Sequence, residues 1–150
     1  MKQTFKHLGE NISGTCLIGS AETLGAFSFF HIETQLGANV PPHVHQNEDE
    51  VLYILEGTYR LQLGSRLFTA AKGEVIYLPR TVVHSFECTS EAGGTLLVLT
   101  LPGGFEAFFT QLDAFGALPM PPTQEDIERF AAMLGRYGMT PSAPPPKVRW

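Results

Sequence analysis

Short apolar segments recur along residues 15–100, and this succession constrains the fold of the chain more than any other feature. The segments are rich in aromatic and aliphatic residues, and they cover residues 27–34, 50–57, 58–63, 66–70, 74–79, 82–87 and 95–102. Gly, Pro, Ser or Asn separates them about every eight to twelve residues, a spacing typical of β-sandwiches and β-barrels. Gly64 and Ser65 lie between two alternating segments, which predicts a two-residue hairpin of type II′.

The C-terminal third has a different pattern. Residues 105–112 indicate one or two helical turns, and Thr123 to Asp126 has the form of a capping box that starts a second helix. The apolar positions that follow recur at helical spacing, and they are Ile127, Phe130, Ala131 and Leu134. The last residues, 140–150, are rich in proline and are expected to run extended over the surface.

These patterns predict one domain over residues 1–150. We expect an all-β barrel over about residues 15–102, followed by a helical and proline-rich extension over about residues 103–150. Two cysteines, Cys16 and Cys88, are too few for a disulfide framework and are expected to pack as small hydrophobic residues.

Charge and hydropathy exclude several classes of function. The net charge of -5 and the pI near 5.5 provide no basic surface for nucleic acid. No apolar run reaches the roughly eighteen residues needed to span a membrane, and the N-terminal residues lack the apolar core of a signal peptide. We therefore expect a cytoplasmic protein that binds neither nucleic acid nor membrane.

Residues 37–57 contain the pattern that indicates chemistry. His43 and His45 lie one residue apart in an extended segment that begins with two prolines, so their side chains are expected on the same face of a strand. Glu50, just before an apolar strand, adds an anionic oxygen. Such mixed nitrogen and oxygen donors suit divalent first-row transition metals. Glu48 and Asp49 are rival carboxylates, which we expect to be solvated loop acids.

The spacing around these donors resembles the first motif of the cupin superfamily, which is formed here by Gly37, His43, His45, Glu50 and Gly57. Gly73, Pro79 and His84 then match the spacing of the second cupin motif. Two positions depart from that motif, because Thr81 stands where the pattern has Gly and Cys88 stands where it has Asn. The resemblance covers about residues 25–102.

The resemblance implies an antiparallel β-barrel of jelly-roll type with one metal ion inside. Carried over by position, the metal ligands are His43, His45, Glu50 and His84. The ion would be divalent Fe, Mn, Ni, Cu or Zn, with one or two coordination positions open to water or substrate. The alternative is an emptied pocket in which these four side chains only hydrogen-bond to one another.

Three functions remain open, because one fold hosts many activities. The donor set resembles that of quercetin-dioxygenase-like cupins, which implies a metal-dependent dioxygenase acting on a small organic substrate, such as an aromatic compound, with Glu50 as catalytic base. The second function is a metal-dependent isomerase or lyase. The third is a non-enzymatic module that binds a small molecule.

The remaining histidines and aromatic residues have simpler interpretations. His31 is expected to be a satisfied strand histidine, the alternative being a residue that supports a metal ligand, and His7 lies in a polar N-terminal stretch. Most strand aromatics are expected in the core, namely Phe27, Phe29, Tyr53, Tyr59, Tyr77 and Phe86. Any that line the barrel mouth would favour an apolar ligand. The resemblance also implies a homodimer formed through the sheets.

Overall fold

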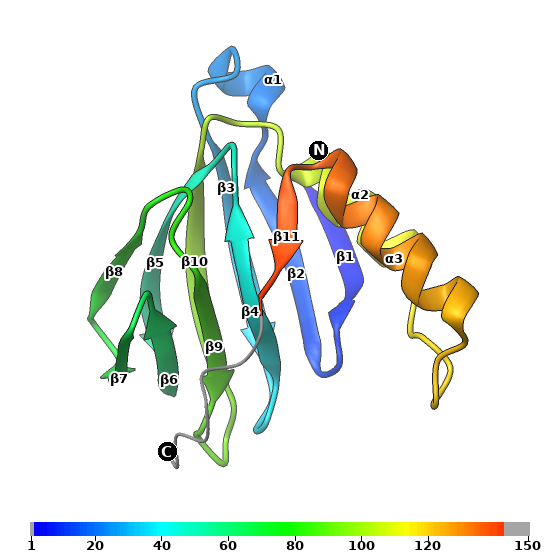
Figure 1. Cartoon of the computed structure of the whole chain (residues 1–150). Coiled ribbons are helices and arrows are strands. Elements are labelled where there is room, and N and C mark those ends of the chain that lie inside the picture. The colour runs from blue at the N-terminus through cyan, green and yellow to red at the C-terminus, as the bar shows by residue number, and fades with distance from the viewer. Residues whose placement is uncertain (1, 143–150) are drawn as a thin grey trace.

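Two antiparallel sheets face each other in the computed structural model, which describes residues 2–142 (Figure 1). The first sheet has the order β1-β2-β3-β10-β5-β8 and the second has the order β11-β4-β9-β6-β7. The strands of the first sheet are β1 (Gln3–Gly9), β2 (Ile12–Ile18), β3 (Ser28–Thr34), β10 (Gly94–Leu101), β5 (Asp49–Glu56) and β8 (Val75–Leu78). Those of the second are β11 (Met139–Pro141), β4 (Asn39–His45), β9 (His84–Cys88), β6 (Thr58–Leu63) and β7 (Arg66–Ala71). The predicted all-β jelly roll is confirmed.

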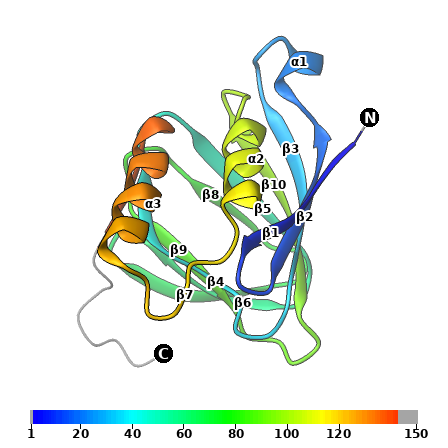
Figure 2. The ribbon, with the colours of Figure 1, turned by 90° about the vertical axis from the view of Figure 1, so that its right-hand side faces the viewer.

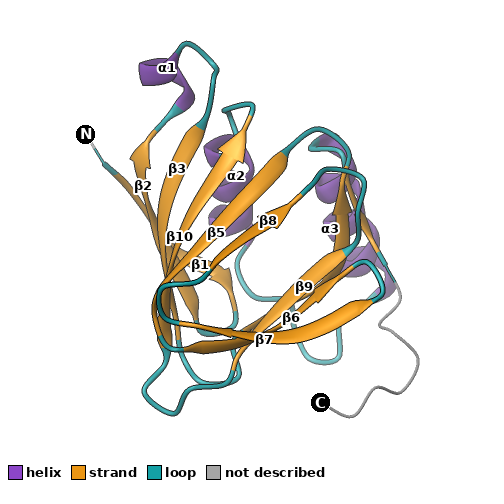
Figure 3. Cartoon of the chain, turned by 90° about the vertical axis from the view of Figure 1, so that its left-hand side faces the viewer, coloured by secondary structure: helices purple, strands orange, loops and turns teal. Residues whose placement is uncertain are grey.

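The two sheets are not closed into one continuous barrel, which corrects a detail of the expected architecture. Figure 3 shows them as two separate layers that face each other. At one open side, α2 (Glu106–Phe115) packs against β1 and α3 (Gln124–Arg136) packs against β11, so helices fill the space that further strand pairing would close (Figure 2). A short helix, α1 (Ser20–Thr23), connects β2 to β3.

Alternation along the strands divides each sheet into a core face and an outer face. In β10, Leu96 and Val98 are buried, whereas Leu97 and Leu99 point to the other face and are only half-buried. The core between the sheets combines apolar side chains of both layers, among them Phe30, Ile32, Leu52, Ile54, Leu96, Val98, Tyr59, Leu61, Ala70 and Cys88. The predicted hairpin is confirmed, because Leu63 pairs with Arg66 and Gly64 has a positive φ of 60°.

The first sheet starts earlier in the chain than the expected barrel, because β1 begins at Gln3. Only Phe5 and Leu8 of this strand are buried, so its polar sequence conceals its place in the sheet. Phe5 and Phe30 both pack edge-on against Phe109 of α2, with ring centroids 5.6 and 4.8 Å from it, which fixes α2 over the N-terminal strands.

The C-terminal segment is more regular than the sequence indicates. Helix α2 has 10 residues instead of one or two turns. The predicted capping box of α3 is confirmed, since Thr123 Oγ1 accepts a hydrogen bond from the Asp126 amide and Asp126 Oδ2 accepts one from the Thr123 amide. The predicted packing face is partly wrong, because Ile127 and Ala131 are exposed and the buried side chains are Met133 and Leu134.

Residues 143–150, which hold most of the proline-rich tail, lie outside the described residues. Within residues 2–142, no helix has both the length and the apolar character needed to cross a membrane.

Candidate metal centre

The four predicted metal ligands lie together between the two sheets. His43 and His45 are on β4, and His84 begins β9, where it pairs in register with His43. Glu50 reaches the same point from β5 in the opposite sheet. One nitrogen or oxygen donor of each of the four residues lies within 4.8 Å of the donors of the others. The strands of both sheets therefore build one cluster from residues that are distant in sequence.

The donor atoms are spaced as ligands of a single ion. The Nε2 atoms of His43 and His45 are 2.9 Å apart. Glu50 Oε2 lies 2.8 Å from His84 Nε2 and 3.3 Å from His45 Nε2. Adjacent ligands around an ion at about 2.1 Å are separated by about 3 Å. These separations fit a first-row transition metal held by the four side chains.

The other ring nitrogens show why the cluster suits a cation. His43 Nδ1 lies 2.8 Å from the Pro41 carbonyl oxygen, and His84 Nδ1 lies 3.3 Å from that of Val82. A carbonyl only accepts, so each Nδ1 carries the proton and each Nε2 presents a lone pair to the cluster. Imidazole lone pairs and a carboxylate then face one another. Such a set of acceptors is stabilised by a cation at its centre.

Burial and charge give the cluster an unusual protonation pattern. His45, His84 and Glu50 are buried, and His43 is half-buried. Burial and the neighbouring His84 and His45 lower the pKa of His43 to about 4. Burial by itself would raise the pKa of Glu50, but its close contacts with His84, His45 and His43 outweigh burial and lower this pKa to about 2. Near neutral pH, the cluster therefore contains an unprotonated imidazole at His43 and a carboxylate at Glu50.

Two further residues border the cluster. The Phe105 ring, at the start of α2, lies 5.2 Å from the His45 ring between centroids and covers it with apolar surface. Thr100 is the register partner of Glu50 on β10 and is fully buried on the same face. The Thr100 hydroxyl has no hydrogen-bond partner among residues 2–142. A buried hydroxyl of this kind suits a water molecule or a ligand oxygen.

The neighbouring carboxylates are not simple solvated loop acids, which corrects that expectation. The side chain of Glu48 is 15% exposed, and its Oε2 lies 3.4 Å from His45 Nδ1. Asp49 points elsewhere: its Oδ1 accepts hydrogen bonds from the Arg80 amide at 2.8 Å and from Arg80 Nε at 3.3 Å. The Arg80 guanidinium and amide lower the pKa of Asp49. Consecutive acids thus contact different partners.

The two departures from the cupin pattern have clear structural results. Thr81 has a positive φ of 67°, so it adopts the left-handed backbone that glycine favours at this position. Its amide donates to the His45 carbonyl oxygen at 2.7 Å, which ties the second motif to the ligand strand. Cys88 is fully buried, and its backbone bonds to Gly37 and Ala38. Both positions are thus held by backbone hydrogen bonds.

The other predicted positions lie away from the cluster. His31 is on the outer face of β3, so it does not support a metal ligand. His7 is exposed on β1. The expectation that most strand aromatics are core is only partly right: Tyr59 is buried and Phe86 packs on the core, but Tyr53 and Tyr77 are exposed on the outer face of the first sheet.

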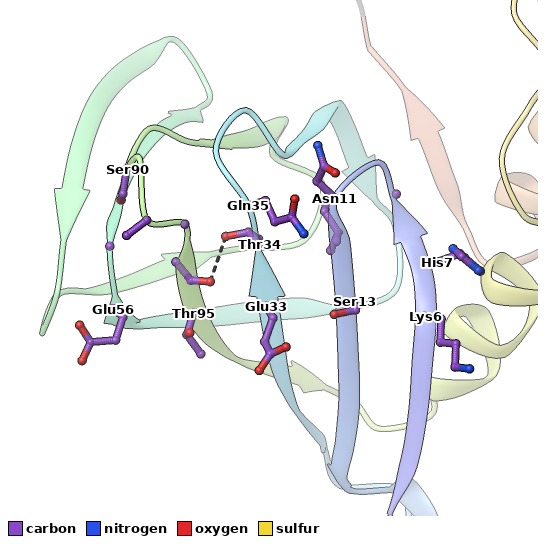
Figure 4. Close-up of a pocket in the computed structure, with 16 residues that line it drawn as sticks. Lys6, His7, Asn11, Ser13, Glu33, Thr34, Gln35, Glu56, Ser90 and Thr95 are labelled. Carbon is purple, nitrogen blue, oxygen red and sulfur yellow. Dashed lines mark hydrogen bonds between the residues drawn. The ribbon is translucent and has the colours of Figure 1, made fainter.

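A separate surface hollow of about 760 Å³ lies at the far ends of β1, β3 and β10 (Figure 4). None of the four cluster residues lines it. Its labelled side chains, such as Lys6, Glu33 and Glu56, are spread along the strands and do not point toward one another. The hollow has no convergent set of catalytic groups, so the cluster is the stronger candidate site.

Known proteins resemble this chain in both sequence and fold. A family model described as a cupin domain matches residues 30–100. Germin-like protein subfamily 2 member 4 of Arabidopsis thaliana is 32% identical over 113 residues, which cover 68% of this chain and 50% of that protein. The chain spans about half the length of the germin-like relatives that it matches.

Solved structures share the jelly-roll fold. KdgF from a Halomonas species has a TM-score of 0.62 at 15% identity, with 70% of this chain and 91% of that chain covered. The polyketide cyclase RemF from Streptomyces resistomycificus has a TM-score of 0.54 at 28% identity, with 61% of this chain and 66% of that chain covered. The chain therefore contains a segment that is similar to the cupin domain, at residues 30–100, and it shares its fold with these structures.

Proposed function

We propose that this protein is a metal-dependent enzyme that acts on a small organic substrate, and that dioxygenation is its first candidate reaction. The convergence of three imidazole nitrogens and the Glu50 oxygen on one buried point is the observation that supports a metal centre. The donor set resembles that of quercetin-dioxygenase-like cupins. An ion that takes five or six ligands, such as Fe, Mn or Ni, would keep one or two coordination positions open beside these four, as a reactive centre requires.

The residues around the centre have distinct roles in this proposal. His43, His45, His84 and Glu50 would hold one divalent ion, which supplies Lewis acidity and, if it is redox-active, reactivity toward dioxygen. Phe105 covers His45 and excludes water from that side. The Thr100 hydroxyl is positioned to bond an oxygen of the substrate. His43 is the half-buried ligand, so a small molecule would reach the centre from its side.

Glu50 acts first as an anionic ligand. A pKa of about 2 makes this carboxylate a weak base near neutral pH. A role of Glu50 as catalytic base therefore requires that substrate binding weaken its contacts with His84 and His45. Glu50→Asp, which keeps the charge but shortens the side chain, tests this role: loss of turnover with retained metal would support proton transfer by Glu50.

A second candidate is a reaction without redox change, such as isomerisation, elimination or ring closure. The 28% identity to the polyketide cyclase RemF favours this candidate. In such a reaction, polarisation of a substrate carbonyl would be sufficient. Binding without turnover, as in a small-molecule sensor, is the third candidate.

The first experiment is metal analysis of gently purified protein, with His43→Ala and Glu50→Ala as variants that remove one ligand each. One divalent ion per chain in the wild type and its loss in both variants is the expected result. Wild-type protein that contains no such ion and binds none on titration would contradict every metal-dependent function proposed here.

The second experiment uses metal-loaded protein and a panel of phenols and 1,3-diketones. Oxygen uptake coupled to product formation supports the dioxygenase, and turnover under nitrogen supports the non-redox reaction. Saturable binding without product in either atmosphere supports the binding module. The three functions are thereby separated in one series of measurements.

We also propose that a second copy of the chain covers the outer face of the first sheet. We call this surface the outer apolar face, and it consists of two rows of side chains that are neighbours in the strand register. The first row is Phe29, Leu99, Val51 and Tyr77, and the second row is His31, Leu97, Tyr53 and Val75. Tyr53, Val75 and Tyr77 are 38%, 61% and 56% exposed. These three side chains are neighbours on one face, and a contiguous exposed apolar patch is the kind of surface that binds a partner.

Charge favours a second copy as the occupant of the outer apolar face. The chain has a net charge of -5, yet the two rows contain no acidic side chain. Acids lie only beyond them, at Glu33 and Glu56 next to the second row and at Asp49, paired with Arg80, next to the first. Two copies that meet on this face do not bring their carboxylates together.

A further inference from the structure

We propose that Glu48 is a positioning residue of the metal centre: its carboxylate accepts the Nδ1 proton of His45 and directs the His45 Nε2 lone pair to the ion. The inference rests on the proposed metal centre and deepens it. Glu48 lies in the bend between β4 and β5, outside the set of four ligands. It reaches the cluster only through His45.

The two facing atoms have no alternative partner. His45 Nδ1 and Glu48 Oε2 are both buried, and neither has a hydrogen-bond partner within 3.5 Å of acceptable geometry among the described residues. They lie 3.4 Å from each other. Leaving a buried imidazole N–H and a buried carboxylate oxygen unpaired is costly, so a small side-chain rotation that shortens this 3.4 Å contact to a hydrogen bond would satisfy both groups.

His45 differs from the other two histidines in the partner of its outer nitrogen. His43 and His84 direct Nδ1 to backbone carbonyls two residues earlier, at Pro41 and Val82. Only His45 directs Nδ1 to a carboxylate. A carboxylate partner fixes the tautomer more strongly than a neutral carbonyl does and makes the imidazole a better electron donor.

The backbone on both sides of Glu48 is held in place. The Gln46 amide donates to the Gly138 carbonyl oxygen at 2.9 Å, so this side of the bend is attached to the segment after α3. On the other side of Glu48, the Asp49 carboxylate accepts a hydrogen bond from the Arg80 amide. Glu48 is thus presented to His45 by anchored neighbours, as a positioning residue requires.

Glu48 also changes the charge of the centre. Three neutral imidazoles, Glu50 and a divalent ion sum to one positive charge, and the Glu48 carboxylate brings the total to zero. A neutral buried group is favoured over a charged one in a site of low polarity. Removing the Glu48 charge should therefore weaken the hold on a cation even though all four ligands remain.

Asp49 provides a matched control, because it is the next residue, carries the same charge and contacts Arg80 instead of the cluster. The test compares Glu48→Gln with Asp49→Asn in the full chain. Zn²⁺ affinity is measured by competition with a chelator, and the tautomer of His45 is measured in metal-free protein by long-range ¹⁵N–¹H NMR at pH 8. Circular dichroism confirms that each variant is folded.

We expect Glu48→Gln to lower Zn²⁺ affinity by about 10- to 100-fold and to shift the His45 ring from the Nδ1–H form toward a mixture of tautomers. Asp49→Asn should leave both readouts within about twofold of wild type. Wild-type affinity together with an unchanged tautomer in Glu48→Gln would overturn the inference, as would equal losses in the two variants. Failure of the metal centre itself is distinguishable, because wild-type protein would then bind no Zn²⁺.

Discussion

The Nε2 atoms of His43 and His45 lie 2.9 Å apart although the Nδ1 atoms of both rings are directed at acceptors. With the His45 proton on Nδ1, as proposed above, the two imidazoles present two lone pairs to each other. This arrangement is unfavourable without a positive charge between the rings. The fold keeps them there because the alternation of β4 places both side chains on one face.

Metal ions should consequently stabilise the folded protein. At a free Zn²⁺ concentration of about 1,000 times Kd, binding should add about 4 kcal/mol to the free energy of unfolding and raise Tm by about 10 °C. Thermal unfolding with and without Zn²⁺ measures this shift. His84→Ala should abolish it, whereas His31→Ala, on the outer face of β3, should retain it. An equal shift in wild type and His84→Ala would mean that Zn²⁺ binds elsewhere.

The stability of the metal-free protein should fall as the pH decreases from 6.5 to about 4. The folded state holds the pKa of His43 near 4, below its ordinary value of 6.5, so the unfolded state binds more protons in this range. The contribution of His43 to the free energy of unfolding is complete above pH 6.5 and is lost as the pH falls toward 4. This loss is at most about 3 kcal/mol. Glu50 adds a further loss between pH 4.5 and about 2.

Urea unfolding in the presence of a chelator, at a series of pH values, measures this dependence. His43→Asn should flatten the slope between pH 6.5 and 4, and His7→Asn, which changes an exposed histidine on β1, should not. His45 acts in the opposite direction, since the carboxylates of Glu48 and Glu50 outweigh its burial and raise its pKa. If His43→Asn left the slope unchanged, the pH dependence between 6.5 and 4 would not come from His43.

Replacing Thr81 with glycine should stabilise the protein by about 0.5 to 1 kcal/mol. A β-branched residue at a φ of 67° is strained, and glycine relieves that strain at a smaller cost in the entropy of the unfolded chain. The hydrogen bond from the residue 81 amide to His45 is kept. Asn11→Gly, at a φ of 61°, is the comparison, and it should gain less because asparagine tolerates this conformation. A loss of stability in Thr81→Gly would show that the Thr81 side chain makes a favourable contribution.

Tyr77→Glu should prevent self-association. In the proposed dimer, this change buries a carboxylate in the outer apolar face on each copy, next to Val51. Light scattering should give about twice the 16.4 kDa chain mass for the wild type and one chain mass for the variant. Leu24→Glu alters a side chain that is 95% exposed outside this face and should leave the dimer intact. A monomeric wild type at high concentration would refute the dimer.

The convergence of the predicted ligand residues was predictable from the sequence because it depends on local periodicity. His43 and His45 share a face through the two-residue repeat of a strand, and His84 follows from the spacing of the second motif. The type II′ hairpin at Gly64 was predictable for the same reason, since its backbone conformation depends on a single glycine.

The features that could not be predicted depend on the direction of individual side chains or on which face of an element is covered by the rest of the fold. Glu48 and Asp49 are adjacent acids, and nothing in their sequence shows that one contacts His45 and the other Arg80. The packing face of α3 was misjudged because the helical spacing does not show which side of the helix joins the core, and Met133 and Leu134 are the residues that do so. The exposure of Tyr77 likewise depends on which face of β8 is covered.

Strand β11 pairs with the ligand strand itself, as Met139 lies opposite His45 and Pro141 lies opposite His43. Without β11, β4 would be an edge strand with unpaired backbone groups along the two histidines. We therefore expect the order of this C-terminal strand to be coupled to the occupancy of the proposed metal centre, and such a coupling acts with the same free energy in both directions. Metal binding should then increase the protection of the β11 backbone amides from hydrogen exchange, at a distance from the proposed ligands.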